Sequence, residues 1–290
     1  MSIIESALEK SRAAGQQENR SRGRRAGELE AERAADRRQL AAAIDPTARL
    51  QSLAVSVDEN QCRERRVLLG KSKADDMGAA AAYRMLRTRL LHRVRTKGWT
   101  TIAVTSAGQN DGKTLTAINL ALSMAREKGR EIVLLDLDMR NPGVCRVLGV
   151  HPPRELRACL EQGEHMRELF FSIGSDNLLI AGSTTPTEQA SELLASPRFS
   201  ELLRVVREGA VNPVVIIDLP PVLLTDDALV VAPKIDAVLI VASEGFTGRA
   251  DLSKALQLLS EFNIAGVVLN RAADTTPGYE YGYDYAGAKD

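Results

Sequence analysis

Three consecutive residues, Gly112, Lys113 and Thr114, have the types and the order needed to hold a triphosphate. A glycine lets backbone N–H groups close around phosphate oxygens where a helix begins. The lysine adds positive charge beside the β- and γ-phosphates, and the threonine hydroxyl can bind Mg²⁺. The pattern departs from G-x-x-x-x-G-K-[ST] only in Ala107, which replaces the first glycine. The predicted nucleotide-binding residues of this loop are Ala107, Gly108, Gln109, Asn110, Asp111, Gly112, Lys113, Thr114 and Leu115.

Three aspartates follow apolar runs and supply carboxylates that a magnesium ion could use. Asp136 and Asp138 end the run that begins at residue 131, and Asp218 ends the run that begins at residue 214. Any one of them alone is explained better as a helix cap or a solvated residue, and the loop alone could be a glycine-rich turn with a surface lysine. Together they predict a site for a nucleoside triphosphate and Mg²⁺.

Four of the five tyrosines crowd into the last dozen residues, where they alternate with Glu280, Gly282 and Asp284. A segment of this kind, with glycines and a chain end, does not make a core strand and is predicted to be mobile. Mobile phenols near a nucleotide site are suited to accept phosphate, and the alternative is a tyrosine-rich tail without chemistry. The predicted phosphate acceptors are Tyr279, Tyr281, Tyr283 and Tyr285.

The composition limits the classes of function. The chain has 290 residues, 44% of them hydrophobic, with 38 basic and 38 acidic side chains. This balance gives no overall field that would favour nucleic acid, which is therefore not an expected partner. The three cysteines are far apart, so neither a disulfide framework nor a metal cluster is indicated. Because no signal peptide and no run of about 20 apolar residues is found, a cytoplasmic protein is predicted that a partner would recruit to a membrane.

Alternating strand and helix patterns predict an α/β fold with a doubly wound, mostly parallel sheet flanked by helices, as in P-loop nucleoside triphosphatases. Ligands in such sheets bind outside the carboxyl ends of the strands. Further strands after the one leading into the loop are expected at residues 131–136, 177–181, 214–218, 237–242 and 265–269. Helices are expected at residues 75–97, 115–128, 191–195 and 249–262, with another beginning at the Ser196-Pro197 pair.

Three parts of the chain are predicted. Residues 1–74 form a charged, flexible extension, because the stretch 15–38 is rich in Arg, Glu and Ala and has almost no apolar side chain to bury. Residues 75–276 form the nucleotide-binding domain. Residues 277–290 form the tyrosine-bearing tail.

These motifs resemble those of the bacterial tyrosine kinases, the P-loop autokinases of polysaccharide biosynthesis. Residues 107–114 are similar to the Walker A loop of that family, residues 134–140 to its second acidic motif, and residues 215–221 to its Walker B motif. The resemblance covers the chain from about Tyr83 to its end and is closest to the stand-alone cytoplasmic form of exopolysaccharide loci.

The resemblance implies that ATP donates its γ-phosphoryl group, with Mg²⁺, to a tail tyrosine of a neighbouring subunit. Lys113 would neutralise charge in the transition state, and Asp136 would orient or deprotonate the phenol. Asp138 and Asp218 would hold the metal and its waters, with Thr114 and Asp136 also counted as metal ligands. Asn270 corresponds to the asparagine near adenine in related ATPases. The implied partners are a membrane polysaccharide co-polymerase as activator, a tyrosine phosphatase and further copies of the chain.

Two departures from the family pattern keep other functions open. Gln109 stands where the family has proline, and Ala81 replaces the acid of its Glu-x-x-Arg-x-x-Arg oligomerisation motif, whose arginines Arg84 and Arg87 remain. One alternative is a positioning ATPase of the septum or chromosome-partitioning type, although Gly108 stands where those proteins carry a second lysine. The other alternative is a nucleotide-binding regulatory subunit of a membrane co-polymerase that transfers little phosphate.

Overall fold

The computed structural model describes residues 49–70, 77–163 and 165–272, which belong to one compact unit that begins at Arg49. The predicted acceptors Tyr279, Tyr281, Tyr283 and Tyr285 lie outside the described residues, as does most of the predicted N-terminal extension.

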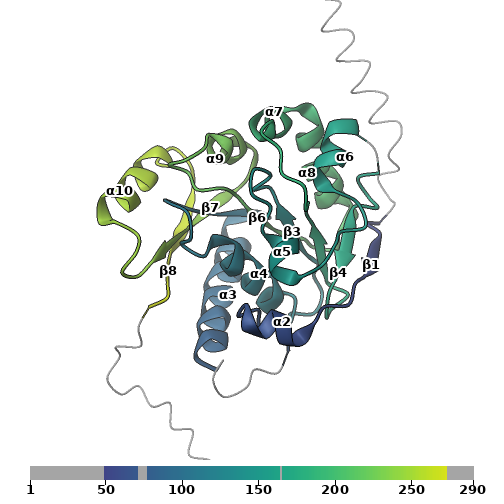
Figure 1. Cartoon of the computed structure of the whole chain (residues 1–290), viewed down its shortest axis with the longest axis horizontal. Helices are drawn as coiled ribbons and strands as arrows, with labels where there is room; N and C mark the ends of the chain where they lie inside the picture. Colours follow the sequence, from purple (N-terminus) through teal and green to yellow (C-terminus); the bar gives the residue numbers. More distant parts are fainter. Residues whose placement is uncertain (1–48, 71–76, 164, 273–290) are drawn as a thin grey trace, which may run out of the picture. The chain divides into compact units, whose positions relative to one another are not determined.

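The unit is built on an eight-stranded sheet with the order β1-β4-β5-β3-β6-β2-β7-β8 (Figure 1). All neighbouring strands run parallel except β4 and β5, which are antiparallel. The predicted doubly wound, mostly parallel sheet is thereby confirmed. The strands are β1 (Ser52–Ala54), β2 (Thr101–Ser106), β3 (Ile132–Asp136), β4 (Phe170–Ser172), β5 (Leu178–Ala181), β6 (Val214–Asp218), β7 (Ala237–Ser243) and β8 (Ile264–Asn270).

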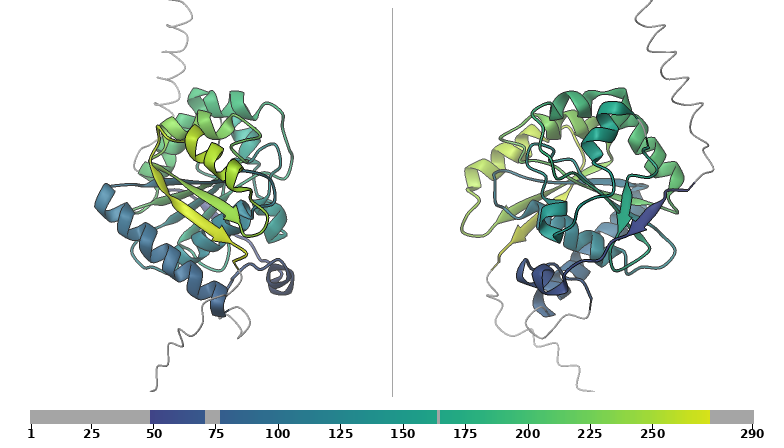
Figure 2. Two further views of the ribbon diagram at one scale, coloured as in Figure 1. Left: turned by 90° about the vertical axis from the view of Figure 1, so that its left-hand side faces the viewer. Right: turned by 45° about the vertical axis from the view of Figure 1, so that its right-hand side comes forward.

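Helices cover both faces of the sheet, and Figure 2 shows α3 on one face and α10 on the other. Successive side chains of a strand point to opposite faces of the sheet. Because helices cover both faces, each central strand is buried on both sides. Ile102 and Val104 of β2, for example, belong to the core shared with α3 and α4. The helices are α2 (Glu59–Glu64), α3 (Met77–Lys97), α4 (Lys113–Met124), α5 (Val144–Leu148), α6 (Leu156–Gln162), α7 (Ala190–Ala195), α8 (Pro197–Gly209), α9 (Asp227–Val231) and α10 (Arg249–Leu258), with a 3₁₀ turn at Ala232–Lys234.

The predicted boundary of the extension differs from the structure. Residues 49–70, which composition assigns to the extension of residues 1–74, contain β1 and α2. Strand β1 pairs with β4 at the edge of the sheet, and the buried Cys62 of α2 belongs to the same core as α3 and α4. These elements have only three and six residues, too few for a clear hydrophobic period.

Helix α3 begins at Met77, within the predicted range of residues 75–97. The buried side chains are Ala80, Leu90, Leu91 and Val94, whereas Met77 and Met85 are 62% and 55% exposed. The helix therefore packs on the sheet mainly through its C-terminal half.

The sheet brings the ends of three parallel strands together. Asp136 of β3 and Asp218 of β6 are direct partners in register, and Asp218 also pairs with Val104 of β2. The loops that follow β2, β3 and β6 therefore meet at one edge, where ligands bind in open parallel sheets. Within the described ranges, no helix combines the length and the apolar character required to cross a membrane.

Candidate active site

The phosphate loop connects β2 to α4 and depends on glycine at its last position. Gly112 has a φ of 89°, in the left-handed region, and a Cβ atom there would lie 2.1 Å from Nδ2 of Asn270. Asn270, at the end of β8, donates a 2.9 Å hydrogen bond to the carbonyl of Asp111. A side chain at position 112 would be strained and would also collide with Asn270. The C-terminal strand thus helps to shape the loop.

Asp111 holds the loop from inside. Its side chain is buried, and it accepts hydrogen bonds from the backbone N–H of Gly108 at 3.1 Å and from the hydroxyl of Thr247. Thr247 lies in the turn after β7 and was not among the residues predicted from sequence. Its only sequence signal is a threonine in a Gly-containing turn after a buried strand, which is too common to indicate a site.

Lys113 lies among the three predicted acids. Its Nζ is 2.6 Å from Oδ2 of Asp138 and 3.4 Å from the hydroxyl of Thr114. Burial disfavours the charge on Lys113, but the carboxylates of Asp218, Asp138 and Asp136 together outweigh it and raise its pKa. The lysine is therefore charged and is already held on the side of the site where the acids lie.

Asp136 is buried and occupied by backbone donors. Its Oδ2 accepts from the N–H groups of Gly143 at 2.9 Å and Val144 at 2.8 Å, and its Oδ1 accepts from the N–H of Asp138 at 3.3 Å. The bonds from Gly143 and Val144 cap the start of α5. Burial and the nearby charge of Asp218 raise the pKa of Asp136 well above its usual range, although the backbone donors oppose this shift. Its oxygens therefore have little capacity left for a ligand.

Asp218 is the opposite case. It is fully buried, and neither carboxylate oxygen has a hydrogen-bond partner among the described residues. Burial raises its pKa to about 6, partly offset by Lys113 and by the nearby hydroxyl of Thr114. An unpaired carboxylate in the interior is costly. Lys113 offsets this cost only in part, and a cation bound directly to the carboxylate would reduce it further.

The donors present fit a magnesium ion that completes its shell with phosphate and water. No cluster of three or more His, Cys, Asp or Glu side chains suited to hold a metal alone occurs in the described part of the chain. Mg²⁺ in nucleotide sites, however, is held by one or two protein oxygens together with phosphates and waters. The unpaired Asp218 and the hydroxyl of Thr114 are donors of this kind.

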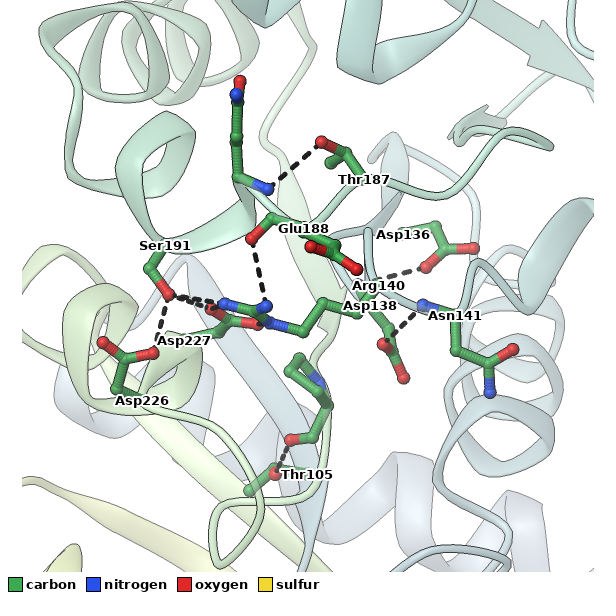
Figure 3. Close-up of polar contacts among 12 residues, drawn as sticks. Thr105, Asp136, Asp138, Arg140, Asn141, Thr187, Glu188, Ser191, Asp226 and Asp227 are labelled. Atoms are coloured by element: carbon green, nitrogen blue, oxygen red, sulfur yellow. Dashed lines mark hydrogen bonds and ion pairs between the residues drawn. The ribbon is translucent and has the colours of Figure 1, made fainter.

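The ion pair between Arg140 and Asp227 was not predicted from the sequence. Arg140 follows the second acidic motif, and its Nε donates to Oδ2 of Asp227 at 3.1 Å. It also donates to the carbonyl of Glu188 and to the hydroxyl of Ser191 (Figure 3). That hydroxyl lies 2.6 Å from an oxygen of Asp226 and 2.6 Å from an oxygen of Asp227, and its one proton can be donated to either. This network joins the loop after β3 to α7 and α9. Its sequence signal is weak, because Arg140 and Asp227 are 87 positions apart.

The structure brings Lys113, Thr114, Asp136, Asp138 and Asp218 together at one edge of the sheet. It places Asn270 against the phosphate loop through the carbonyl of Asp111. The contact of Asn270 with adenine remains a prediction.

The comparison with protein families gives a match over residues 99–281 to the ParA family model, described as NUBPL iron-transfer P-loop NTPase. Among known proteins, tyrosine-protein kinase CpsD of Streptococcus pneumoniae is 32% identical over 59% of this chain and 75% of that protein. Tyrosine-protein kinase YwqD of Bacillus subtilis is 28% identical over 72% of this chain and 86% of that protein.

Solved structures agree with these relatives. The kinase domain of VpsO shares 25% identity with a TM-score of 0.60, over 70% of this chain and all of that chain. The kinase domain of Escherichia coli tyrosine kinase ETK has the same fold, with a TM-score of 0.63 at 23% identity over 81% of this chain and 95% of that chain. With its phosphate loop and paired strand-end acids, the chain belongs to the bacterial tyrosine kinases of the ParA-like P-loop family, and it is a nucleotide-binding protein-tyrosine kinase.

Proposed function

We propose that the protein is an ATP- and Mg²⁺-dependent autokinase that phosphorylates the tyrosines of its own C-terminal tail, between copies of the chain. The observation that carries the proposal is the arrangement around Lys113, whose ammonium group lies 2.6 Å from Asp138 beside the unpaired carboxylate of Asp218. This arrangement supplies a positive charge for a phosphoryl group, oxygen ligands for a cation and a carboxylate that can take a proton.

The residues of the loop bind and orient the triphosphate. Backbone N–H groups between Gly108 and Thr114 would surround its phosphates, and Lys113 would leave Asp138 to neutralise the β- and γ-phosphates. Thr114 and Asp218 would hold Mg²⁺. When bound, the ion would neutralise charge that develops on the phosphate oxygens.

Asp138 is the acid that we assign to the acceptor phenol, in place of Asp136. The family resemblance assigns the phenol to Asp136 and the metal with its waters to Asp138, but Asp136 already accepts three backbone hydrogen bonds, two of them at the start of α5. Asp138 points toward Lys113. As the phenol oxygen bonds to the γ-phosphorus, its proton passes to Asp138, and the bond from that phosphorus to the bridging oxygen breaks to release ADP.

A membrane partner is part of the proposal. The protein EpsB of Ralstonia solanacearum is 26% identical over 77% of this chain, which covers only 30% of that longer protein. One of the similar solved structures is the chimerical protein CapA2B2, with a TM-score of 0.62 at 23% identity over 77% of this chain and 95% of that chain. The resemblance of the motifs to the autokinases of exopolysaccharide loci leads us to propose a cytoplasmic kinase that works with a separate polysaccharide co-polymerase at the inner face of the membrane and regulates exopolysaccharide polymerisation and export. A tyrosine phosphatase would reverse the modification.

A second candidate function is a nucleotide-binding regulatory subunit that transfers little phosphate. Ala81 favours it, because the position lacks the acid of the oligomerisation motif. The second arginine of that motif, Arg87, donates within its own chain to the carbonyl of Ser123 at 3.0 Å. A chain that assembles poorly would seldom present its tail to a neighbour.

One experiment separates the two functions. The purified full-length protein is incubated with ATP and Mg²⁺, with and without the cytoplasmic segment of a co-polymerase, and the tail is examined by mass spectrometry. The kinase proposal requires phosphate on the tail tyrosines and none in Lys113→Met, which should still fold. A tail that stays free of phosphate in both conditions, while ATP still binds, would establish the regulatory subunit.

A further inference from the structure

A basic pocket of about 500 Å³ opens beside the loop that carries Asp138. Helices α2 and α5 are neighbours (Figure 1), and the pocket is lined by residues at both of these helices and by Thr184 and Pro186 after β5. Arg65, Arg146 and His151 line it together with Arg140, and no carboxylate belongs to the described residues of its lining. A concave surface with several cations and no acid attracts anions.

Two of the arginines are held in place but are not neutralised. Arg65 donates through Nη1 to the carbonyls of Arg146 and Val147, and Arg146 donates through Nη1 to Oδ1 of Asn141 at 2.9 Å. Both side chains are exposed, and neither forms an ion pair with another described residue. Each guanidinium has five N–H donors in a rigid fork, so most of its donors remain for a ligand. Arg140, in contrast, is committed to Asp227.

The pocket adjoins the place where the acceptor phenol must come. The N–H of Asn141 donates to Oδ1 of Asp138 at 3.2 Å (Figure 3). The side chain of the same asparagine accepts a hydrogen bond from Arg146. Asn141 therefore links Asp138, the acid that we assign to the phenol, with Arg146. A peptide whose tyrosine reaches Asp138 has its next residues beside this pocket, because each residue of extended chain spans about 3.3 to 3.6 Å.

The tail has the complementary charge. Its acceptor tyrosines are interleaved with Glu280 and Asp284, which lie one residue before and three residues after Tyr281. We propose that the pocket, defined by Arg65, Arg146 and His151, binds the carboxylates of this segment from a second copy of the chain and so presents its tyrosines to Asp138. The inference rests on the proposed function, because it names the element that recognises the acceptor. Guanidinium and carboxylate groups are suited to paired hydrogen bonds.

The test uses the full-length chain with its four tail tyrosines changed to phenylalanine, so that the enzyme cannot label itself there. A synthetic peptide of residues 276–290 is the acceptor, and a second peptide carries Glu280→Gln and Asp284→Asn. We expect Arg146→Gln to raise the KM for the acidic peptide about tenfold, the effect of losing roughly 1.4 kcal/mol of binding. Arg146→Lys should recover part of the loss, and the KM for ATP should not follow this pattern.

The controls separate charge at this pocket from charge in general. Arg63→Gln removes an exposed arginine of α2 that does not line the pocket, and it should leave the KM for the peptide unchanged. The peptide with Glu280→Gln and Asp284→Asn should bind weakly to the unaltered pocket. Arg146→Gln should weaken the binding of this peptide no further, because in a double-mutant cycle the loss of one partner has no effect once the other partner is gone. If Arg146→Gln raises the KM equally for both peptides, or leaves the KM for the acidic peptide unchanged, the proposal is overturned.

Direct binding distinguishes failure of this inference from failure of the proposed function. The anisotropy of a fluorescent tail peptide, measured without ATP, should show weaker binding to Arg146→Gln and Arg65→Gln and recovery in Arg146→Lys. If no peptide is ever phosphorylated but this pattern holds, only the kinase proposal fails. If inorganic phosphate displaces the peptide and binds with the same Arg146 dependence as the acidic tail, the pocket is a general anion site and the inference is overturned.

Discussion

The ammonium group of Lys113 lies 2.6 Å from the carboxylate of Asp138, and both side chains are largely buried. The lysine that a phosphate loop needs for the triphosphate is therefore held by an acid in the loop that follows β3. Nucleotide binding must break this ion pair, and the acid released is the one that we assign to the phenol. The ion pair thus opposes nucleotide binding, and it also holds Asp138, the proton acceptor, in position.

Asp138→Asn should separate these two effects. Without the ion pair Lys113 is free for phosphates, so ATP should bind several-fold more tightly, while phosphate transfer should fall by about 10²- to 10⁴-fold for loss of the general base. Calorimetric titration with ATP and tail labelling measure the two quantities. Asp251→Asn, on the exposed face of α10, is the matched control and should change neither. Weaker ATP binding in Asp138→Asn would contradict the competing role of the ion pair.

Asp218→Asn should stabilise the metal-free protein in a pH-dependent way. Burial raises the pKa of Asp218 from 3.8 to about 6, so the folded state binds its proton more tightly than the unfolded state does. Below about pH 4 the carboxyl group of Asp218 therefore does not lower the free energy of unfolding. The loss grows between pH 4 and 6 and reaches its full value of roughly 2 to 3 kcal/mol above pH 6.

Urea unfolding in the presence of EDTA measures this difference. The variant and the original protein should have equal free energies of unfolding near pH 4, and the variant should be more stable at pH 7 to 8. Nucleotide binding that depends on Mg²⁺ should be lost in the same variant. A variant less stable than the original at pH 8 would show that Asp218 has a partner that stabilises its charge.

Arg140→Met should destabilise the fold although it is outside the phosphate loop. It leaves the fully buried Asp227 without its cation, and breaking a buried ion pair in this way typically costs 3 to 5 kcal/mol. About 2 to 4 kcal/mol is expected here, because the arginine side chain is 34% exposed. The double variant with Asp227→Leu should recover most of the loss in urea unfolding. Additive losses would show that the ion pair is not the cause.

Gly112→Ala should lower the free energy of unfolding by more than the strain of a left-handed backbone alone would. Gly129 has a similar φ of 85°, and no atom lies within 4 Å of the position that a Cβ would take there. Gly129→Ala therefore measures the strain by itself, about 1 to 2 kcal/mol. At position 112 the collision with Asn270 adds to this cost, and nucleotide binding should also be lost. Thermal unfolding and ATP titration of both variants give the comparison, and equal losses of stability would mean that Asn270 moves aside freely.

The sequence by itself determined the positions of the central strands and of the phosphate loop. Runs such as 132–136 and 214–218 are continuous and apolar, and a strand buried on both faces has that pattern whatever its neighbours are. The types Gly112, Lys113 and Thr114 indicate phosphate binding because their chemistry is local. The three acids Asp136, Asp138 and Asp218 were likewise visible as charges that end apolar runs.

Only the tertiary structure determined which role each of these acids can have. Asp136 and Asp218 look alike in sequence, yet one caps α5 and the other has no hydrogen-bond partner among the described residues. The contacts of Asn270 with the loop and of Arg140 with Asp227 join positions 159 and 87 residues apart. Such contacts depend on the order of strands in the sheet, which no local pattern encodes, because hydrophobic periodicity reports burial and not the identity of the neighbour.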